Sequence, residues 1–135
     1  MPEKSTGVDD LLAEARRDLK RLSPRETLAA TSRGAVLIDI RSDSQRAEDG
    51  VIPSSAHVAR NVLEWRLDPG CEHRDRTLSD GDRQLILLCD EGYQSSLAAA
   101  TIRSFGVDVT DVIGGFQAWR EAGLPVTRLA GQPGA

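Results

Sequence analysis

"QLILLCDEGYQSSLAAATIRSFG", residues 84–106, joins the most apolar run of the chain to an alanine-rich segment. The run at 84–89 has the composition of a buried strand, and it ends in Cys89. The segment at 95–106 opens on two serines, which suit a helix cap, and ends at a glycine, so it is expected to be a helix. A strand, a short loop and a helix therefore follow one another, with a thiol at the end of the strand.

The segments on either side continue this alternation. Apolar and β-branched residues predict further strands at 35–40, at the end of 51–59 and at 109–114. Apolar periodicity and capping patterns predict helices at 8–22, 23–34, 42–50, 61–68 and 115–123. The polar, turn-rich segment 69–83 is expected to be a loop. Strands that alternate with helices predict an α/β fold, with a mostly parallel central sheet and helices on both faces.

Length and charge limit the classes of function. The 135 residues suffice for one domain with its own core, and we expect a peripheral helix at 1–22, a main domain at 23–126 and a loose tail at 127–135. The net charge of -4 argues against nucleic acid as a partner. The chain has no apolar run of membrane-spanning length and no signal-peptide core at its N-terminus. We therefore expect no membrane partner and a cytoplasmic location.

The position of Cys89 predicts a reactive thiol. In parallel α/β sheets the ligand site lies beyond the carboxyl ends of the strands, and Cys89 stands at that end of the central strand. Backbone N–H groups between a strand end and a helix start surround a small concavity, where a thiolate is stabilised. Gly92 permits the loop to curl around the sulfur. The alternative is an inert buried thiol that packs like a small hydrophobic side chain.

Four ordered segments resemble the rhodanese-like, single-domain sulfurtransferases. "VLIDIR" (36–41) is similar to the Asp–x–Arg motif of that family's first strand, and "GVIPSSAHV" (50–58) to its Gly–x–Ile–Pro–Gly–Ala turn. "CDEGYQSS" (89–96) resembles its cysteine loop, and "VIGGFQAWREAGLPV" (112–126) its Gly–Gly–x–x–x–Trp segment. The resemblance covers about residues 23 to 126 and implies the three-layer α/β sandwich of the family.

The resemblance also implies a mechanism. Cys89 would attack a sulfane sulfur donor, become a persulfide and pass the outer sulfur to a thiol or to cyanide. The partners would be a sulfur donor and a thiol acceptor, either small or borne by a protein, and the reaction needs neither a metal nor an organic cofactor. With Cys89, the loop residues implied to form the site are Asp90, Glu91, Gly92, Tyr93, Gln94 and Ser95.

The charge of this loop departs from the family pattern. Many members carry an arginine five positions after the cysteine, where this chain has Gln94. Asp90 and Glu91 directly follow Cys89, and the loop contains no Lys or Arg. Two acids should repel a dianion such as thiosulfate and oppose formation of a thiolate. A neutral or protein-borne persulfide donor is less affected.

Positive charge is therefore expected from outside the loop. Arg41 matches the first-strand arginine of the family, and Arg66 lies in a segment that flanks the pocket in similar small rhodaneses. We predict that Arg66 faces the Cys89 pocket, that Arg41 supports the loop backbone, and that Asp39 holds the shape of the site. The alternatives are that Arg41 pairs with a surface acid and that Arg66 belongs to the helix surface.

Two other functions compete with sulfur transfer. A phosphatase or arsenate reductase of related fold needs a longer cysteine loop, closed by an arginine that grips a tetrahedral oxyanion. Here the first arginine after Cys89 is Arg103. A non-catalytic module that docks a partner protein fits the acidic loop but not the retained cysteine. Cys71 and His73 are too few for a zinc site, and we expect no metal.

Overall fold

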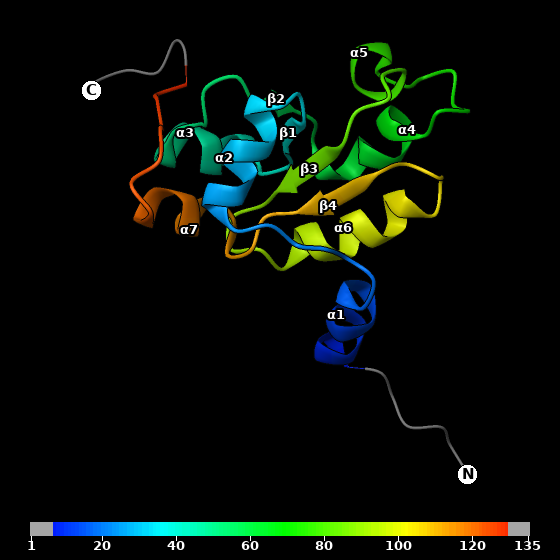
Figure 1. The fold of residues 1–135 in the computed structure, drawn as a ribbon, viewed down its shortest axis with the longest axis horizontal. Coiled ribbons are helices and arrows are strands. Elements are labelled where there is room, and N and C mark those ends of the chain that lie inside the picture. The colour runs from blue at the N-terminus through cyan, green and yellow to red at the C-terminus, as the bar shows by residue number, and fades with distance from the viewer. Residues whose placement is uncertain (1–6, 130–135) are drawn as a thin grey trace.

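The computed structural model describes residues 7–129, which form a four-stranded sheet covered by helices (Figure 1). The strands are β1 (Val36–Asp39), β2 (Ala56–His57), β3 (Leu85–Leu88) and β4 (Val109–Asp111). They lie in the order β2-β1-β3-β4, and every neighbouring pair is parallel. The parallel α/β class predicted from the sequence is confirmed, with β3 in the interior of the sheet.

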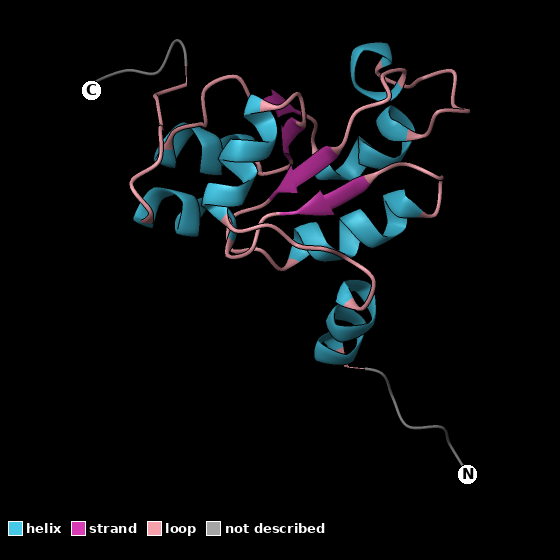
Figure 2. Ribbon diagram, in the orientation of Figure 1, coloured by secondary structure: helices cyan, strands magenta, loops and turns pink. Residues whose placement is uncertain are grey.

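Helices connect these strands and cover the sheet (Figure 2). They are α1 (Val8–Arg16), α2 (Pro24–Ser32), α3 (Asp43–Asp49), α4 (Leu63–Leu67), α5 (Arg76–Ser79), α6 (Gln94–Arg103) and α7 (Gly115–Glu121), with a 3₁₀ turn η1 (Arg60–Val62) before α4. Among the described residues, none of the helices has the length and apolar character needed to cross a membrane.

Two separate apolar cores lie on opposite faces of the sheet. Successive strand residues point to opposite faces, so Leu87 packs with α4 and α6, whereas Ile86 packs with α2 and α7. Trp119 and Phe116 of α7 are almost fully buried in the second core. Because both faces are covered, β3 and the first three residues of β1 appear in the sequence as apolar runs. The predicted three-layer sandwich is confirmed.

The N-terminal helix is shorter than the sequence predicts. α1 ends at Arg16 and packs against α6, apart from the sheet, as Figure 1 shows. The following residues run back to the sheet, where Leu22 N donates to Asp111 O at 3.1 Å and Ile113 N donates to Leu22 O at 2.8 Å. This return path carries the segment between α1 and α2 across the carboxyl end of β4.

The segment 69–83, expected to be a loop, contains the short helix α5. The Asp75 side chain caps this helix by accepting a hydrogen bond from Leu78 N at 3.2 Å, and Leu78 is buried in the core with α4 and α6. A single turn with one buried residue has too little periodicity to be recognised in the sequence.

Near the C-terminus, Thr127, the first residue of the predicted loose tail, exchanges backbone hydrogen bonds with Val51 at 2.7 and 2.8 Å. The last part of that tail, 130–135, lies outside the described residues.

Candidate active site

Cys89 follows β3 directly and lies in a cradle of backbone amides. Its Sγ accepts hydrogen bonds from Gly92 N at 3.1 Å and from Ser95 N at 3.3 Å. The residue is 5% exposed, so little water competes for these donors. Gly92 has a φ of +87°, a conformation that other residues rarely adopt, and this turn brings the loop amide back over the sulfur. Two N–H dipoles thus converge on the point where a sulfur anion would be stabilised.

A hydroxyl and a carboxylate extend this cradle into the protein. Ser95 Oγ lies 3.2 Å from Cys89 Sγ and donates its hydrogen to Asp111 Oδ2 at 2.7 Å. Because the Ser95 hydrogen is directed at Asp111, the Ser95 oxygen accepts the hydrogen of the thiol in this arrangement. Rotation of the hydroxyl toward the sulfur would add a side-chain donor to the two amides that a thiolate already has.

The carboxylate of Asp111 is fully buried and has further donors. Ser96 Oγ donates to Oδ2 at 2.7 Å, and Arg21 donates from Nε to Oδ1 at 2.9 Å and from Nη2 to Oδ2 at 3.2 Å. The two serines were expected to cap the helix. They lie instead inside the first turn of α6, whose N-cap is Tyr93, because both hydroxyls bond to Asp111 of the neighbouring strand. Asp111 can therefore release the Ser95 hydrogen and remain paired.

Two arginines from outside the loop reach its backbone. Arg16 Nη2 donates to Gly92 O at 2.7 Å and Arg21 Nη2 donates to the same oxygen at 2.9 Å. Arg16 Nε also donates to Ser96 Oγ at 3.0 Å, and its guanidinium lies 5.7 Å from the centroid of the Tyr93 ring. Positive charge was expected from outside the loop, but these two residues were missed, because no local pattern in the sequence links them to the loop.

The N-terminus of α7 packs directly against the other side of the loop. Phe116 N donates to Cys89 O at 2.9 Å, and Gln117 N donates to Asp90 O at 3.0 Å. A Cβ on Gly115 would lie 2.5 Å from Cys89 O, closer than atoms approach without displacement. The glycine pair before α7 therefore allows the helix to hold the loop through backbone hydrogen bonds.

Arg41 and Asp39 form a buried ion pair at the end of β1. Arg41 Nη2 donates to Asp39 Oδ2 at 2.8 Å and Nε donates to Oδ1 at 3.1 Å, while the Arg41 amide donates to Oδ1 at 3.0 Å. Nη2 also donates to Gly50 O at 2.8 Å, and the guanidinium lies 3.8 Å from the centroid of the Phe116 ring. Arg41 thus pairs with Asp39 and not with a surface acid. The backbone group that its guanidinium contacts is Gly50 O. The guanidinium also packs on the ring of Phe116, whose amide donates to Cys89 O.

Four of the six predicted loop residues line a pocket of about 460 Å³ over Cys89, whereas Gly92 and Ser95 contact the sulfur and do not line it. The other residues that line it are Arg41, Gln45, Asp90, Glu91, Tyr93 and Gln94. Glu91 and Tyr93 are exposed, and the Asp90 carboxylate accepts a hydrogen bond from Gln117 Nε2 at 2.9 Å. The structure brings these residues together, and the two acids give the pocket a negative rim.

Arg66 does not belong to this group. Its Nη1 donates to His73 O at 3.0 Å, and its own carbonyl accepts from Asp75 N at 2.8 Å. It lines neither the Cys89 pocket nor the neighbouring pocket of about 390 Å³ around His57. The expectation that Arg66 faces Cys89 is therefore corrected: the guanidinium holds the loop that follows α4.

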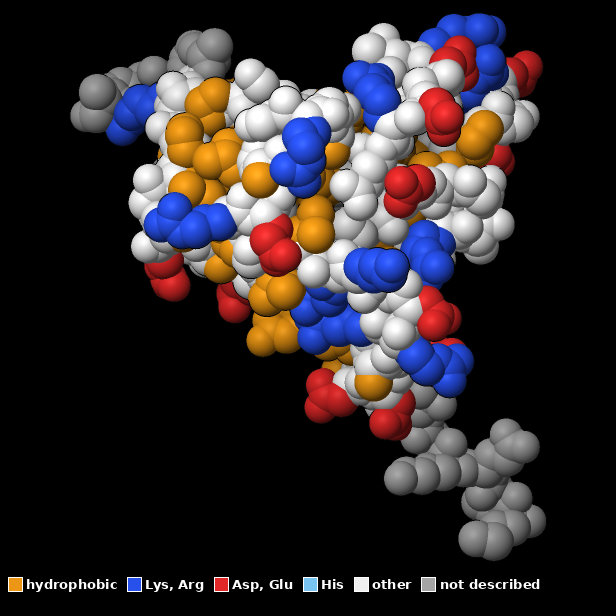
Figure 3. All heavy atoms as spheres, in the orientation of Figure 1, with side chains coloured by type: hydrophobic (Ala, Val, Ile, Leu, Met, Phe, Trp, Pro, Cys, Tyr) orange, Lys and Arg blue, Asp and Glu red, His pale blue; other side chains and the backbone are white. Residues whose placement is uncertain are grey.

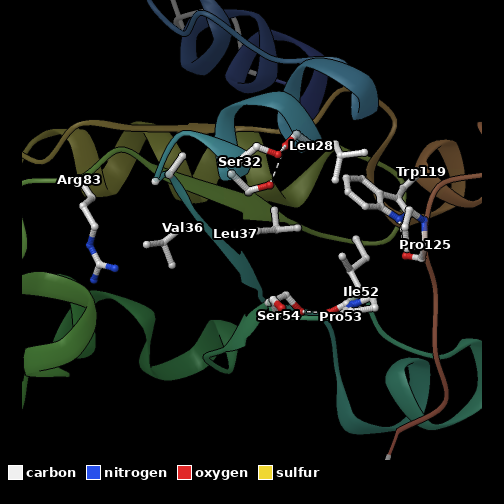
Figure 4. Close-up of a pocket in the computed structure, with 14 residues that line it drawn as sticks. Leu28, Ser32, Val36, Leu37, Ile52, Pro53, Ser54, Arg83, Trp119 and Pro125 are labelled. Atoms are coloured by element: carbon white, nitrogen blue, oxygen red, sulfur yellow. Dashed lines mark hydrogen bonds between the residues drawn. The ribbon is translucent and has the colours of Figure 1, made fainter.

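A larger pocket, of about 610 Å³, contains none of the predicted site residues (Figure 4). Trp119 and Arg83 lie at its opposite ends, with Val36, Leu37 and Ile52 between them. None of its described lining residues is a cysteine, a histidine or an acid. Of these two pockets, only the smaller one contains a thiol, and we assign the chemistry to it.

The chain is similar to known proteins over most of its length. The family model of the rhodanese-like domain matches residues 23–122. The thiosulfate sulfurtransferase GlpE of Pseudomonas savastanoi pv. phaseolicola is 33% identical over 104 residues, which cover 76% of this chain and 89% of that protein. GlpE of Ectopseudomonas mendocina is 36% identical, with 76% of this chain and 86% of that protein covered.

A solved structure extends the likeness beyond the matched domain. A protein of unknown function from Rhodopseudomonas palustris, described as a possible tyrosine phosphatase, has a TM-score of 0.83 and 32% identity. The comparison covers 94% of this chain and 99% of that chain, so it includes part of the segment before residue 23. The matched family model, the related sequences and the parallel α/β fold together show that this protein belongs to the rhodanese-like domain family.

Proposed function

We propose that this protein is a sulfurtransferase that carries sulfane sulfur as a persulfide on Cys89. The observation that carries the proposal is the sulfur cradle, in which Gly92 N and Ser95 N donate to Cys89 Sγ at the floor of an open pocket. Membership of the rhodanese-like family and relatives named thiosulfate sulfurtransferase support the same activity. Both cysteines, Cys71 and Cys89, are free thiols, which suits a reducing compartment such as the cytoplasm.

The proposed reaction consists of two displacements at sulfur. In the first, the Cys89 thiolate attacks the transferable sulfur of the donor and a bond forms between Sγ and that sulfur. The rest of the donor leaves with the electron pair of the broken bond, which is S–S in thiosulfate or a persulfide and C–S in mercaptopyruvate. In the second, an acceptor thiolate or cyanide attacks the outer sulfur of the persulfide, and Cys89 leaves as the thiolate. The amides of Gly92 and Ser95 would stabilise the negative sulfur in both steps.

The negative rim of the pocket favours donors of low charge. Asp90 and Glu91 line the pocket, and Glu91 is exposed to solvent. Thiosulfate carries two negative charges, so like-charge repulsion should weaken its approach. A persulfide of a small thiol or of a protein places less charge next to these acids. We therefore propose such persulfides as better donors than thiosulfate.

Phosphate-ester hydrolysis receives less support from the site. A phosphatase of related fold grips the oxyanion with an arginine of the cysteine loop, and the loop here contains none. Arg41 lines the pocket, but its Nε and Nη2 are bonded to Asp39 and Gly50 O, so that only the buried Nη1 has no partner among the described residues. Arg16 and Arg21 bond to Gly92 O, the backbone of the loop. The sulfur cradle thus offers backbone amides, without the two-pronged grip that a phosphate requires.

Steady-state kinetics with several donors tests the proposal. Thiosulfate, mercaptopyruvate and glutathione persulfide are compared at equal concentration with cyanide as acceptor, and thiocyanate is measured above the uncatalysed rate. We expect turnover with wild-type protein and with Cys71→Ser, fastest with the persulfide, and none with Cys89→Ser. Absence of turnover with every donor would favour a partner-binding module. Hydrolysis of para-nitrophenyl phosphate that depends on Cys89 would favour the phosphatase.

A further inference from the structure

Two arginines reach the active-site loop, Arg16 from the last position of α1 and Arg21 from the segment that connects α1 to the sheet. We call residues 16–21 the N-terminal arm. Arg16 and Arg21 both donate to Gly92 O, at 2.7 and 2.9 Å, and Gly92 N donates to Cys89 Sγ at 3.1 Å. The two guanidinium groups therefore fix the loop residue whose amide faces the sulfur.

Each arginine also binds a second member of the buried network. Arg16 Nε donates to Ser96 Oγ at 3.0 Å, and Arg21 forms a two-pronged pair with Asp111 at 2.9 and 3.2 Å. Asp111 is fully buried, and the Arg21 side chain is only 15% exposed. A buried carboxylate requires a cationic partner, and Arg21 supplies that partner to the carboxylate that Ser95 contacts.

We propose that Arg16 and Arg21 are positioning residues of the active site, so that the N-terminal arm is an integral part of it. They orient Gly92 N toward Cys89 Sγ, and they keep Asp111 paired when the Ser95 hydroxyl turns toward a sulfur anion. They also place two positive charges behind a loop whose own charged side chains are Asp90 and Glu91. The inference rests on the proposed role of Cys89 as the reacting group.

The position of the arm explains how an acidic cysteine loop can hold a sulfur anion. The loop contains no basic residue, and the arm supplies the cations from a different part of the chain. Figure 3 shows Lys and Arg side chains gathered where this segment crosses the face of the molecule. The matched family model begins at residue 23, so the arm lies outside it, whereas the Rhodopseudomonas palustris structure is similar over 94% of this chain.

Arg16→Ala tests the proposal, and Arg17→Ala is its matched control. Arg17 is the next residue, its side chain is 68% exposed, and its ion-pair partner is Glu14 of the same helix. Both substitutions remove one positive charge, but only the first removes a contact to the loop. The measurements are the rate of Cys89 alkylation by iodoacetamide at fixed pH, kcat and KM with glutathione persulfide, and the melting temperature.

Arg16→Ala removes the bonds to Gly92 O and to Ser96 Oγ. We expect it to slow alkylation and to lower kcat by about tenfold, the effect of losing the charge-assisted bond to Gly92 O, which is the contact that orients the loop amide. KM and the melting temperature should change little, because Arg16 does not line the pocket and belongs to a helix without buried residues. Arg17→Ala should match the wild-type protein in every measurement. A structural role alone would lower the melting temperature and leave the alkylation rate of the folded protein unchanged.

Arg21 requires a milder substitution, because Arg21→Ala would leave the buried Asp111 without its cation. Arg21→Lys retains a positive charge beside Asp111. A lysine ammonium cannot form the bidentate pair with the Asp111 carboxylate and also donate to Gly92 O, as the guanidinium does. We expect this variant to fold and to show alkylation and kcat several-fold below wild type, partly rescued relative to Arg21→Ala.

The outcomes separate this proposal from the sulfurtransferase assignment. If Arg16→Ala and Arg21→Lys alkylate and turn over like the wild-type protein, the arm has no positioning role, although sulfur transfer by Cys89 stands. An equal loss in Arg17→Ala would also overturn the proposal, since it would indicate a general effect of net charge. If the arm variants slow alkylation but no donor supports turnover even in the wild-type protein, the arm does position Cys89 and the proposed function is wrong.

Discussion

Gly115→Ala tests how the end of α7 holds the active-site loop. A Cβ at this position would lie 2.5 Å from Cys89 O and 2.7 Å from both Asp90 C and Asp90 O. All three are backbone atoms that cannot rotate away, so α7 must withdraw by about 1 Å to restore ordinary contact. That displacement would break the hydrogen bonds from Phe116 N to Cys89 O, now 2.9 Å, and from Gln117 N to Asp90 O, now 3.0 Å.

The expected cost has two parts that a control separates. Gly115 has a φ of +62°, and an L-residue in that region costs about 1–2 kcal/mol. The two lost hydrogen bonds add about 1 kcal/mol each, which gives a total of about 3–4 kcal/mol. Gly123 has a φ of +75°, and a Cβ added there would meet nothing within 4 Å, so Gly123→Ala carries only the first part.

Urea denaturation and steady-state sulfur transfer measure the two effects. We expect the free energy of unfolding to fall about 2 kcal/mol further in Gly115→Ala than in Gly123→Ala, the contribution of the two hydrogen bonds. Gly115→Ala should also lose turnover, because the loop carbonyls move with the sulfur cradle, whereas Gly123→Ala should remain active. Equal stability of the two variants together with full activity of Gly115→Ala would refute the role of α7 in holding the loop.

Three further predictions concern charged residues that the sequence analysis linked to the pocket. Arg41→Ala should lower the free energy of unfolding by about 3–5 kcal/mol in urea denaturation, because the buried Asp39 carboxylate loses its main partner; an unchanged value would show that the pair is not stabilising. Replacement of Asp90 and Glu91 by their amides should raise kcat/KM for thiosulfate about tenfold at low salt and less at high salt, and no gain at low salt would mean that these acids do not face the donor. Arg66→Ala should leave KM for anionic donors unchanged, because its guanidinium bonds to the loop that follows α4; a raised KM would contradict that placement.

The sequence predicted the sheet and the place of the thiol for a clear physical reason. Strands covered on both faces are mostly apolar, so 35–40 and 84–89 stand out from the helices around them. Parallel strands end at one edge of the sheet, which places Asp39, Cys89 and the end of β4 together. These inferences need only local patterns and the handedness of the connections.

The remaining parts of the site depend on contacts between distant segments. Arg16 and Arg21 meet Gly92 from 76 and 71 residues away, and no local spacing reveals such a contact. The prediction for Arg66 failed because a five-residue helix shows which residues are apolar, but not how it is rotated relative to a neighbouring pocket. The signal for the missing cations was indirect: a cysteine loop without a basic residue requires charge from elsewhere.

Intact-protein mass spectrometry tests most directly whether Cys89 carries the transferred sulfur. The protein is exposed to glutathione persulfide, desalted and measured before and after addition of cyanide. We predict a gain of about 32 Da, the mass of one sulfur atom, that cyanide removes, that Cys71→Ser retains and that Cys89→Ser lacks. A wild-type protein that gains no sulfur, or a gain that persists in Cys89→Ser, would contradict the assignment.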